Sequence, residues 1–381
     1  MNETAVGLLL KERALESTSE GVVISDCAEP GMPIIYVNRA FTVMTGYTSE
    51  EVLGRNCRFL QGPDTDGSAC EEIRKAIAAQ VPCKVEILNY RKDGRSFWNE
   101  LSITPVRDET GQTTHFIGIQ SDVTRRRHAE QSLRRANEEL KRDLRAAALV
   151  QQAQLPKRLP DVEGLRFAWR FHPCQELAGD TLNILRLDED HVGVYVLDVS
   201  GHGVRAALHS FSLSQDLRPR QDGPCLQAPD EVLRQLNYKY PVDARTGMFF
   251  TILYGMVDVR QCTFTFASAG HPGPVLLRDG QPPQLIETRS FPVGISTEPE
   301  YRSETVQLRS GDKLLLYTDG VAEAMSARDI PFGDERFLRV LGRHQQQPID
   351  EVLDAVLKAL ENWACHVNLR DDISLVGVEV I

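Results

Sequence analysis

The sequence predicts an α+β protein of several domains, and three observations lead to this fold class. The chain has 381 residues, which is enough for two or three domains of ordinary size. Residues 16–124 mix short strands with short helices, whereas residues 156–381 alternate apolar strands, Gly/Asp turns and amphipathic helices. Residues 125–155 are charged, contain no glycine or proline, and are predicted to form a helical linker. Residues 1–15 are expected to form an N-terminal helical cap.

Composition narrows the class of protein further. Hydrophobic residues make up 41% and charged residues 25% of the chain, as in ordinary soluble proteins. The formal net charge of −11 argues against a nucleic-acid partner, because phosphates require a basic surface. No apolar run reaches the roughly 20 residues that span a bilayer, and the N-terminus lacks the pattern of a signal peptide. We therefore expect a cytoplasmic protein with no membrane partner.

The eight cysteines form no CxxC pair and no metal-binding spacing. In a reducing compartment they are expected to be free thiols. Seven of them are interpreted as small buried hydrophobic residues, and Cys57 is the exception for the reasons given below.

Three strands are predicted in the second half of the first domain. Apolar and polar residues alternate in Lys84–Arg91 and in Ser96–Val106, which is typical of half-buried strands. Lys92–Arg95 lies between them and is typical of a hairpin turn. A third strand is predicted at His115–Asp122. The period-2 geometry of a strand places its alternate residues on one face.

Three carboxamide side chains fall among the apolar positions of these strands. Asn89 and Asn99 lie side by side on the apolar face if the loop has an odd number of residues, and Gln120 lies in the third strand. An unpaired buried amide costs about 1–3 kcal/mol. Three amides together therefore indicate a flat partner with donors and acceptors, and the edge of a flavin fits. The alternative is that the amides pair with each other or with the backbone.

A thiol and a further amide are predicted beside these strands. Capping boxes at Thr48–Glu51 and Ser68–Glu71 indicate helices before and after the run Gly54–Gln61. On a short helix within that run, Cys57 and Gln61 would share one face at the i, i+4 spacing.

Two arginines complete this set, because Arg58 and Arg74 offer bidentate donors that suit a terminal phosphate. With these residues in place, residues 20–124 resemble the LOV photoreceptor family, a branch of the PAS fold with an antiparallel sheet and flanking helices. The motifs GRNCRFLQG, NYRKDGRSFWNEL and FIGIQSDVT carry the resemblance in order and spacing. The implied cofactor is FMN.

The resemblance implies a role for each of these side chains. Cys57 would be the photoactive cysteine, which adds to flavin carbon 4a after blue light. Gln120 would sense the protonation change at flavin nitrogen 5 and rotate its amide. The other residues would hold the isoalloxazine ring (Asn56, Gln61, Asn89 and Asn99) and the phosphate (Arg58 and Arg74). The alternative is a PAS domain whose pocket is empty or holds a different ligand.

The linker carries a heptad-like apolar seam with one stutter. Its positions follow steps of four and three residues, and they are Ala129, Leu133, Ala136, Leu140, Leu144 and Ala147. Residues 125–145 also carry eight Lys or Arg against four acids, which is typical of the solvated face of a helix. The seam predicts either a parallel homodimer or a helix that packs on its neighbours.

The second domain places aspartates beside glycines at the ends of predicted strands. A single such aspartate is usually part of a turn. Several of them without a His/Cys ligand set favour a hard cation such as Mg²⁺ or Mn²⁺. The candidate ligands are Asp180, Asp198, Asp319, Asp371 and Asp372.

No motif marks a protein nucleophile in this domain. Neither a G-x-S-x-G elbow nor a Cys-centred motif is present, and Cys225 and Cys262 lie away from the aspartate turns. This favours metal-activated water over a covalent enzyme intermediate. His202 and His271, each in a Gly-rich turn, are candidates for general acids, although such a histidine is often structural.

Residues from about 150 to the end resemble the bacterial type 2C-like serine/threonine phosphatases, in the branch of SpoIIE-like sigma-factor regulators. The motifs are AGD, DVSGHGVRAALHS, SAGHPGPVLL, GDKLLLYTDGVAEA and DDISLVGVEV. The resemblance implies an α-β-β-α sandwich and two Mn²⁺ or Mg²⁺ ions, with a metal-bound water attacking phosphorus. Asp198 would bridge the ions, and the further ligands would be the Val199 carbonyl, Asp180, Asp319 and Asp371, with Asp372 adjacent.

The sequence departs from this family at one place. The family usually has Gly-Gly-Asp followed by an aromatic residue and a second acid, whereas here the residues are Ala178–Asn183 (AGDTLN). Asp180 is retained, but the geometry around it is open to question.

A sensor, a helix and an output domain in one chain suggest a blue-light-regulated serine/threonine phosphatase. Gln120 lies four residues before Thr124, so a change in its hydrogen bonding can shift the linker, and Leu149–Leu159 is the candidate receiver. The resemblance implies a phosphorylated STAS-type anti-sigma-factor antagonist as the substrate. One alternative is a light-sensing adaptor with an inactive phosphatase fold, and another is a redox-sensing flavoprotein in which Cys57 is dispensable.

Overall fold

The computed structural model describes residues 3–219, 228–241, 247–364 and 370–381. The chain divides into two compact units, Met1–Glu139 and Leu140–Ile381. Two of the cysteines considered above, Cys225 and Cys365, lie outside the described residues. None of the described helices combines the length and the apolar character that a membrane crossing requires.

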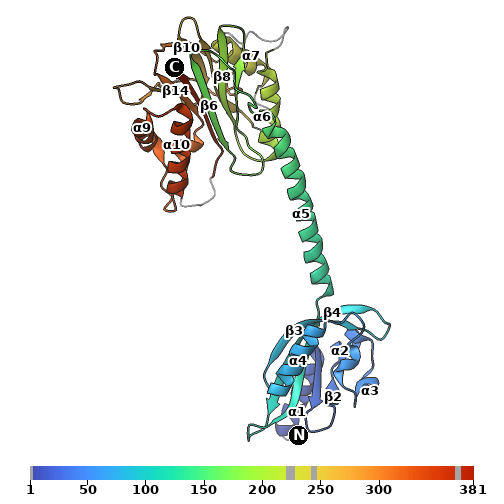
Figure 1. The fold of residues 1–381 in the computed structure, drawn as a ribbon. Helices are drawn as coiled ribbons and strands as arrows, with labels where there is room; N and C mark the ends of the chain where they lie inside the picture. The colour runs from blue at the N-terminus through green and yellow to red at the C-terminus, as the bar shows by residue number, and fades with distance from the viewer. Residues whose placement is uncertain (1–2, 220–227, 242–246, 365–369) are drawn as a thin grey trace. The chain divides into compact units, whose positions relative to one another are not determined.

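The first unit is built on a five-stranded antiparallel sheet in the order β2-β1-β5-β4-β3 (Figure 1). Short helices pack on β1 and β2 through a cluster that includes Phe41, Val52 and Leu60, and α4 packs on β3 through Ala69 and Ala76. This arrangement confirms the predicted antiparallel sheet with flanking helices. The elements are α1 (Glu3–Ser17), β1 (Gly21–Asp26), β2 (Ile34–Val37), α2 (Arg39–Thr45), α3 (Ser49–Val52), the 3₁₀ helix η1 (Cys57–Leu60), α4 (Gly67–Ala79), β3 (Cys83–Tyr90), β4 (Ser96–Arg107) and β5 (Thr113–Asp122).

The hairpin between β3 and β4 forms where the alternation predicted it. Tyr90 pairs with Ser96, and Gly94 adopts a φ of +83° in the connection, a conformation that glycine tolerates best. Five residues therefore separate the paired positions, and this odd number places Asn89 and Asn99 on the same face of the sheet.

Two local predictions around the thiol are wrong. The helix that carries Cys57 is a single 3₁₀ turn, and Gln61 follows it in an extended conformation instead of sharing a helical face with Cys57. The next helix begins earlier than the second capping box predicted. Asp66 is its N-cap and accepts a hydrogen bond from the Ser68 N–H at 3.0 Å, because a carboxylate competes well for that position.

The linker is one helix, α5 (Thr124–Gln152), and none of its residues is buried. Two leucines of the seam, Leu133 and Leu140, are 72% and 57% exposed. The seam therefore lacks a partner within the described part of this chain, and the homodimer stays a prediction.

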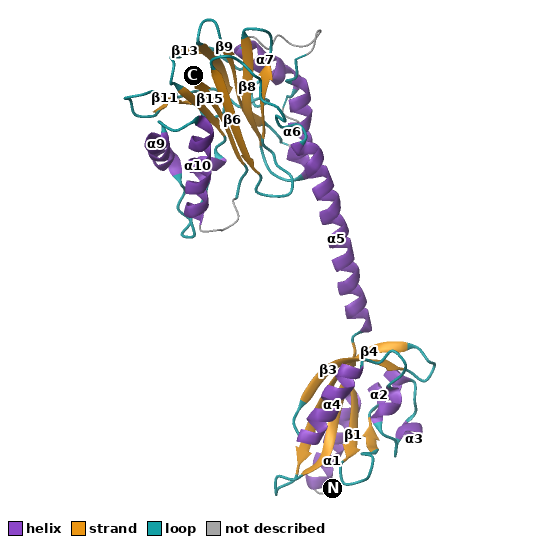
Figure 2. Cartoon of the chain, in the orientation of Figure 1, coloured by secondary structure: helices purple, strands orange, loops and turns teal. Residues whose placement is uncertain are grey.

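The second unit is an α-β-β-α sandwich, which confirms the predicted fold class (Figure 2). One sheet has the order β13-β10-β9-β8-β7 and the other β12-β11-β14-β15-β6. Apolar side chains of both sheets, among them Val194, Phe264 and Val376, form the core between them. Helices α6 and α7 cover the outer face of the first sheet, and α9 and α10 cover the second.

The second unit shows the alternation of strands and helices that was predicted for residues 156–381. The strands are β6 (Leu165–His172), β7 (Thr181–Arg186), β8 (His191–Val199), β9 (Phe250–Asp258), β10 (Thr263–Ala269), β11 (Val275–Leu277), β12 (Gln284–Leu285), β13 (Glu304–Gln307), β14 (Lys313–Tyr317) and β15 (Ile373–Val380). The helices are α6 (Val204–Asp216), α7 (Pro229–Lys239), α8 (Gly320–Glu323), α9 (Gly333–His344) and α10 (Ile349–Ala364).

The interpretation of the cysteines holds only in part. The six described cysteines are free thiols, as expected, and Cys83 is buried. Cys262 is exposed in the turn before β10, so the expectation of a buried hydrophobic residue is wrong there.

Candidate functional site

The first unit contains a cavity of about 800 Å³ between its sheet and its helices. All the residues predicted to hold the cofactor line this cavity, together with apolar side chains such as Val23, Leu60 and Phe116. The predicted residues are Asn56, Cys57, Arg58, Gln61, Arg74, Asn89, Asn99 and Gln120. The volume and the mostly apolar wall with a few polar groups are typical of a cofactor site.

The three amides of the sheet meet at one point of the cavity wall. The Nδ2 group of Asn99 donates to Asn89 Oδ1 and to Gln120 Oε1, both at 2.9 Å. The amides thus pair with each other, as the alternative interpretation expected. The pairing is incomplete, however, because the buried Oδ1 of Asn99 has no hydrogen-bond partner. An orphaned buried acceptor costs about 1–3 kcal/mol, and a cofactor edge that donates a hydrogen bond would satisfy it.

Cys57 enters the cavity from the first position of η1. Burial raises the pKa of its thiol to about 11, and a hydrogen bond with Ser25 opposes this only in part. The sulfur is therefore a neutral thiol at physiological pH. Asn56 caps η1, since its Oδ1 accepts from the Arg58 N–H at 3.0 Å, and its Nδ2 donates to the Gly31 carbonyl at 2.5 Å.

The candidate metal ligands of the second unit lie on turns that pack directly against each other. A Cβ on Gly179 would lie 2.8 Å from the Val199 carbonyl oxygen, and one on Gly320 would lie 2.0 Å from the Asp372 carbonyl oxygen. Asp180 Oδ2 accepts hydrogen bonds from the hydroxyls of Thr318 (2.9 Å) and Ser374 (2.7 Å). Contacts between residues far apart in sequence thus bring the four predicted turns together.

The carboxyl groups at this point raise each other's pKa. Burial raises the pKa of Asp180 well above its usual value, and the nearby Asp198 and Asp372 add to the effect. Burial followed by Asp319 and Asp371 raises the pKa of Asp198 to about 7. The pKa of Asp319 rises to about 6 through burial and its neighbour Asp371. This repulsion is the electrostatic signature of a site that a cation would stabilise.

The donor set fits Mg²⁺ or Mn²⁺, because it consists of oxygen atoms. Within the ranges that the structure describes, no three His, Cys, Asp or Glu side chains are already gathered for metal ligation. Three of the carboxylates, those of Asp180, Asp371 and Asp372, accept hydrogen bonds from protein groups. The partners of Asp372 are distant in sequence. Its Oδ1 accepts from the Cys174 N–H at 2.8 Å and its Oδ2 from the Gly179 N–H at 2.7 Å. This arrangement makes Asp372 an organiser of the turn that carries Asp180.

The two candidate histidines have different environments. His271 is buried, its Nε2 contacts the Tyr317 carbonyl at 3.0 Å and its Nδ1 contacts the Thr251 hydroxyl at 2.8 Å. Burial lowers the pKa of His271 to about 3, so the ring is neutral at neutral pH, which favours the structural alternative over a general acid. His202 is exposed and lies close enough to Asp371 to oppose in part the rise that burial gives the pKa of that carboxyl.

Two residues of this site were missed from the sequence. Glu323 raises the pKa of Asp319 and Asp371, and its position four residues after Asp319 was a usable signal. Gln151, at the end of α5, bonds to both backbone groups of Ala178. Its Nε2 donates to the Ala178 carbonyl at 2.7 Å, and its Oε1 accepts from the Ala178 N–H at 3.2 Å. No sequence pattern pointed to that contact.

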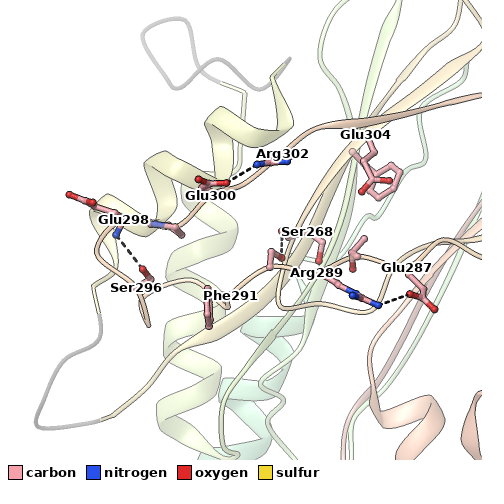
Figure 3. Close-up of a pocket in the computed structure, with 13 residues that line it drawn as sticks. Ser268, Glu287, Arg289, Phe291, Ser296, Glu298, Glu300, Arg302 and Glu304 are labelled. Carbon is pink, nitrogen blue, oxygen red and sulfur yellow. Dashed lines mark hydrogen bonds and ion pairs between the residues drawn. The ribbon is translucent and has the colours of Figure 1, made fainter.

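A second hollow of about 780 Å³ lies beside β10 and β13 and contains none of the predicted site residues (Figure 3). Its two arginines are paired with glutamates of the same hollow, Arg289 with Glu287 and Arg302 with Glu300. Since both arginines are neutralised by neighbouring glutamates, this hollow does not indicate an anionic ligand.

The comparisons with known proteins match parts of both units. A PAS domain model matches residues 19–125, and the model for Stage II sporulation protein E (SpoIIE) matches residues 188–381. The first unit is thus a PAS domain with LOV relatives, and the second is a PP2C-like domain. Because the SpoIIE model covers just over half of the chain, the chain belongs to the SpoIIE family.

The LOV relatives each match about a third of this chain or less. A blue-light-activated histidine kinase of Rhizobium johnstonii is 49% identical over 117 residues, which are 31% of this chain and 34% of that protein. Phototropin-2 of Oryza sativa subsp. japonica is 49% identical over 112 residues, 29% of this chain and 12% of that protein. The chain thus spans about a third or less of the length of the curated relatives that it matches.

The second unit has a structural neighbour, the SiaA-PP2C domain of Pseudomonas aeruginosa. The TM-score is 0.55 with 23% identity, over 64% of this chain and 98% of that one. At this identity the likeness shows the fold alone.

Proposed function

We propose that this chain is a blue-light-regulated protein serine/threonine phosphatase. The observation that carries the proposal is the cavity of the first unit, where a buried thiol, three sheet amides and two arginines line one space in a domain with LOV relatives. The PP2C-like second unit is proposed to supply the output, through the aspartates whose turns pack against each other.

FMN is the cofactor that fits the cavity. When bound, it supplies a ring that blue light excites, and the Sγ of Cys57 is the group proposed to bond reversibly to that ring. Asn56, Gln61, Asn89 and Asn99 are proposed to hold the ring, and Arg58 and Arg74 the phosphate. The neutral thiol of Cys57 keeps its proton in the dark, because burial raises its pKa.

Gln120 lies at the start of a short path to the linker helix. Two residues later, Asp122 Oδ1 accepts a hydrogen bond from the Thr124 N–H at 3.0 Å, and the Thr124 hydroxyl accepts one from the Trp98 N–H at 2.8 Å. A rotation of the Gln120 amide would change the hydrogen bonding of β5 and β4 at the point where α5 begins. We propose this change as the signal.

The receiver is proposed to be the end of α5 and the residues after it, Leu149–Leu159. Gln151 contacts Ala178, which lies two residues before Asp180, and Leu155 is buried in the core between the sheets. A shift of this segment would therefore move the turn that carries a proposed metal ligand.

The second unit is proposed to hydrolyse phosphoserine or phosphothreonine. Asp180, Asp198, Asp319 and Asp371 would hold two Mg²⁺ or Mn²⁺ ions, with the Val199 carbonyl as a further ligand and Asp372 keeping the turn in place. Such ions neutralise phosphate charge and activate water when bound. His202 is proposed as a proton donor beside Asp371. The substrate is proposed to be a phosphorylated STAS-type anti-sigma-factor antagonist, and the linker seam to form a homodimer.

The proposal is tested by phosphatase activity on a phosphorylated STAS protein in the dark and under blue light, with Mn²⁺ present. Cys57→Ala is expected to retain the flavin and its colour but to lose the photocycle and the effect of light, whereas Cys262→Ala, which removes an exposed thiol, should change nothing. Unchanged light regulation in Cys57→Ala would defeat the mechanism and support a redox-sensing flavoprotein.

Asp198→Asn separates the enzyme from a light-sensing adaptor that signals by binding. It is expected to abolish hydrolysis while flavin binding stays normal. Wild-type protein that releases no phosphate with Mn²⁺ in either light condition would favour the adaptor.

A further inference from the structure

The charged residues that line the flavin cavity include one acid. Three of the four are bases, Arg58, Arg74 and Lys75, and the fourth is Glu71. Arg58 comes from η1 and the other three come from α4, whereas Asn89, Asn99 and Gln120 come from the sheet. The phosphate of a bound flavin nucleotide carries a charge of about −1.5 to −2 at neutral pH, like other phosphate monoesters. A carboxylate among the proposed phosphate ligands therefore repels the phosphate.

Glu71 already forms an ion pair with one of the proposed phosphate ligands, Arg74. Its Oε2 lies 2.5 Å from Nη1 of Arg74, one turn away on α4. The two side chains are 47% and 72% exposed, and an exposed pair of this kind adds only about 0–1 kcal/mol to stability. The pair thus contributes little to the fold, but a phosphate can reach the guanidinium of Arg74 fully only if the carboxylate gives way.

We propose that Glu71 is a specificity-determining residue of the cavity, which weakens the preference for a phosphorylated flavin over riboflavin by competing for Arg74. This inference rests on the proposed flavin site. Riboflavin presents a hydroxyl instead of the phosphate, so Glu71 does not repel it. Arg58 and Lys75 remain available to the phosphate in either case.

The test measures the dissociation constants of FMN and of riboflavin for the full chain in the dark, from flavin fluorescence. Glu71→Gln is expected to lower the dissociation constant of FMN by roughly three- to tenfold at low salt, because it removes one partly screened like charge. The constant for riboflavin should change by less than about twofold, and added salt should reduce the gain for FMN.

Glu72→Gln is the matched control, because Glu72 is the adjacent acid of α4 and does not line the cavity. It should leave both constants unchanged. In an Arg74→Ala background Glu71→Gln should lose most of its effect, since the two substitutions act on one contact.

Equal changes for FMN and riboflavin in Glu71→Gln, or an equal gain in Glu72→Gln, would overturn the proposal. If the wild-type chain bound neither flavin, the proposed flavin site itself would be wrong. If the chain bound both flavins and Glu71→Gln left their relative affinities unchanged, only the role of Glu71 would be wrong.

Discussion

Gln151→Ala tests the contact between the end of α5 and the turn of Asp180. Ala178 is 1% exposed, and its N–H and C=O both bond to the Gln151 side chain. A buried backbone group that loses its partner costs about 1–3 kcal/mol. Because Gln151 is only partly buried, water can replace part of the loss, so we expect a destabilisation of about 2–4 kcal/mol. For a unit of this size that lowers the melting temperature by roughly 5–15 °C.

The assay is urea unfolding followed by tryptophan fluorescence, with flavin release as a separate signal. Trp169 and Trp363 report on the second unit, and Trp98 belongs to the first. The loss should appear in the second unit, while flavin release keeps its midpoint. Activity should also require more Mn²⁺, because the turn of Asp180 is less ordered.

Gln152→Ala is the control, since Gln152 is the exposed neighbour on the same helical turn. If Gln151→Ala proved as stable as Gln152→Ala and needed no more Mn²⁺, the contact would have no role in holding the turn, and the reasoning about the receiver would be refuted.

Three further predictions follow from other contacts. Folding raises the pKa of Cys57 from 9.0 to about 11. The stability that the protonated thiol contributes is therefore complete below pH 9 and is lost as the pH rises through 11. Relative to Cys57→Ala, the free energy of unfolding should fall by about 2–3 kcal/mol over this window. Arg126 bridges Glu86 and Glu100, which face each other across β3 and β4. Arg126→Ala should therefore lower the free energy of unfolding by about 0.5–1 kcal/mol, and this difference should disappear at high salt. If Arg126→Ala were no less stable than Arg125→Ala, the bridging role of Arg126 would be contradicted. His271→Gln should lower stability without moving the pH profile of activity between pH 5 and 9, and a shifted profile would show that this histidine titrates.

The sequence was most informative where a strong local pattern coincided with the final packing. The alternation in β3 and β4 and the glycine turn between them fixed the register, and the register alone places Asn89 beside Asn99. Similarly, Asp198 and Asp319 could be placed at the ends of apolar strands, because a continuous apolar run marks a strand that is buried on both faces.

Local rules failed where several weak preferences compete. Asp66 and Ser68 are both good N-caps, and the choice between them depends on how the chain enters α4. The 3₁₀ turn at Cys57 is four residues long, too short for a period to distinguish it from an α-helix. Cys262 looked like other small apolar residues, but a turn with φ of +51° exposes it.

The sequence by itself determined the order of the domains and the fold class of both units, because these depend on periodicity and on residue chemistry. Only the tertiary structure decided which partners the polar groups of both sites have. It buries His271 between Thr251 and Tyr317, ties Asp372 to the turn of Asp180, and leaves Asn99 Oδ1 unpaired. Each of these results depends on contacts between residues that are distant along the chain, and no local pattern encodes such contacts.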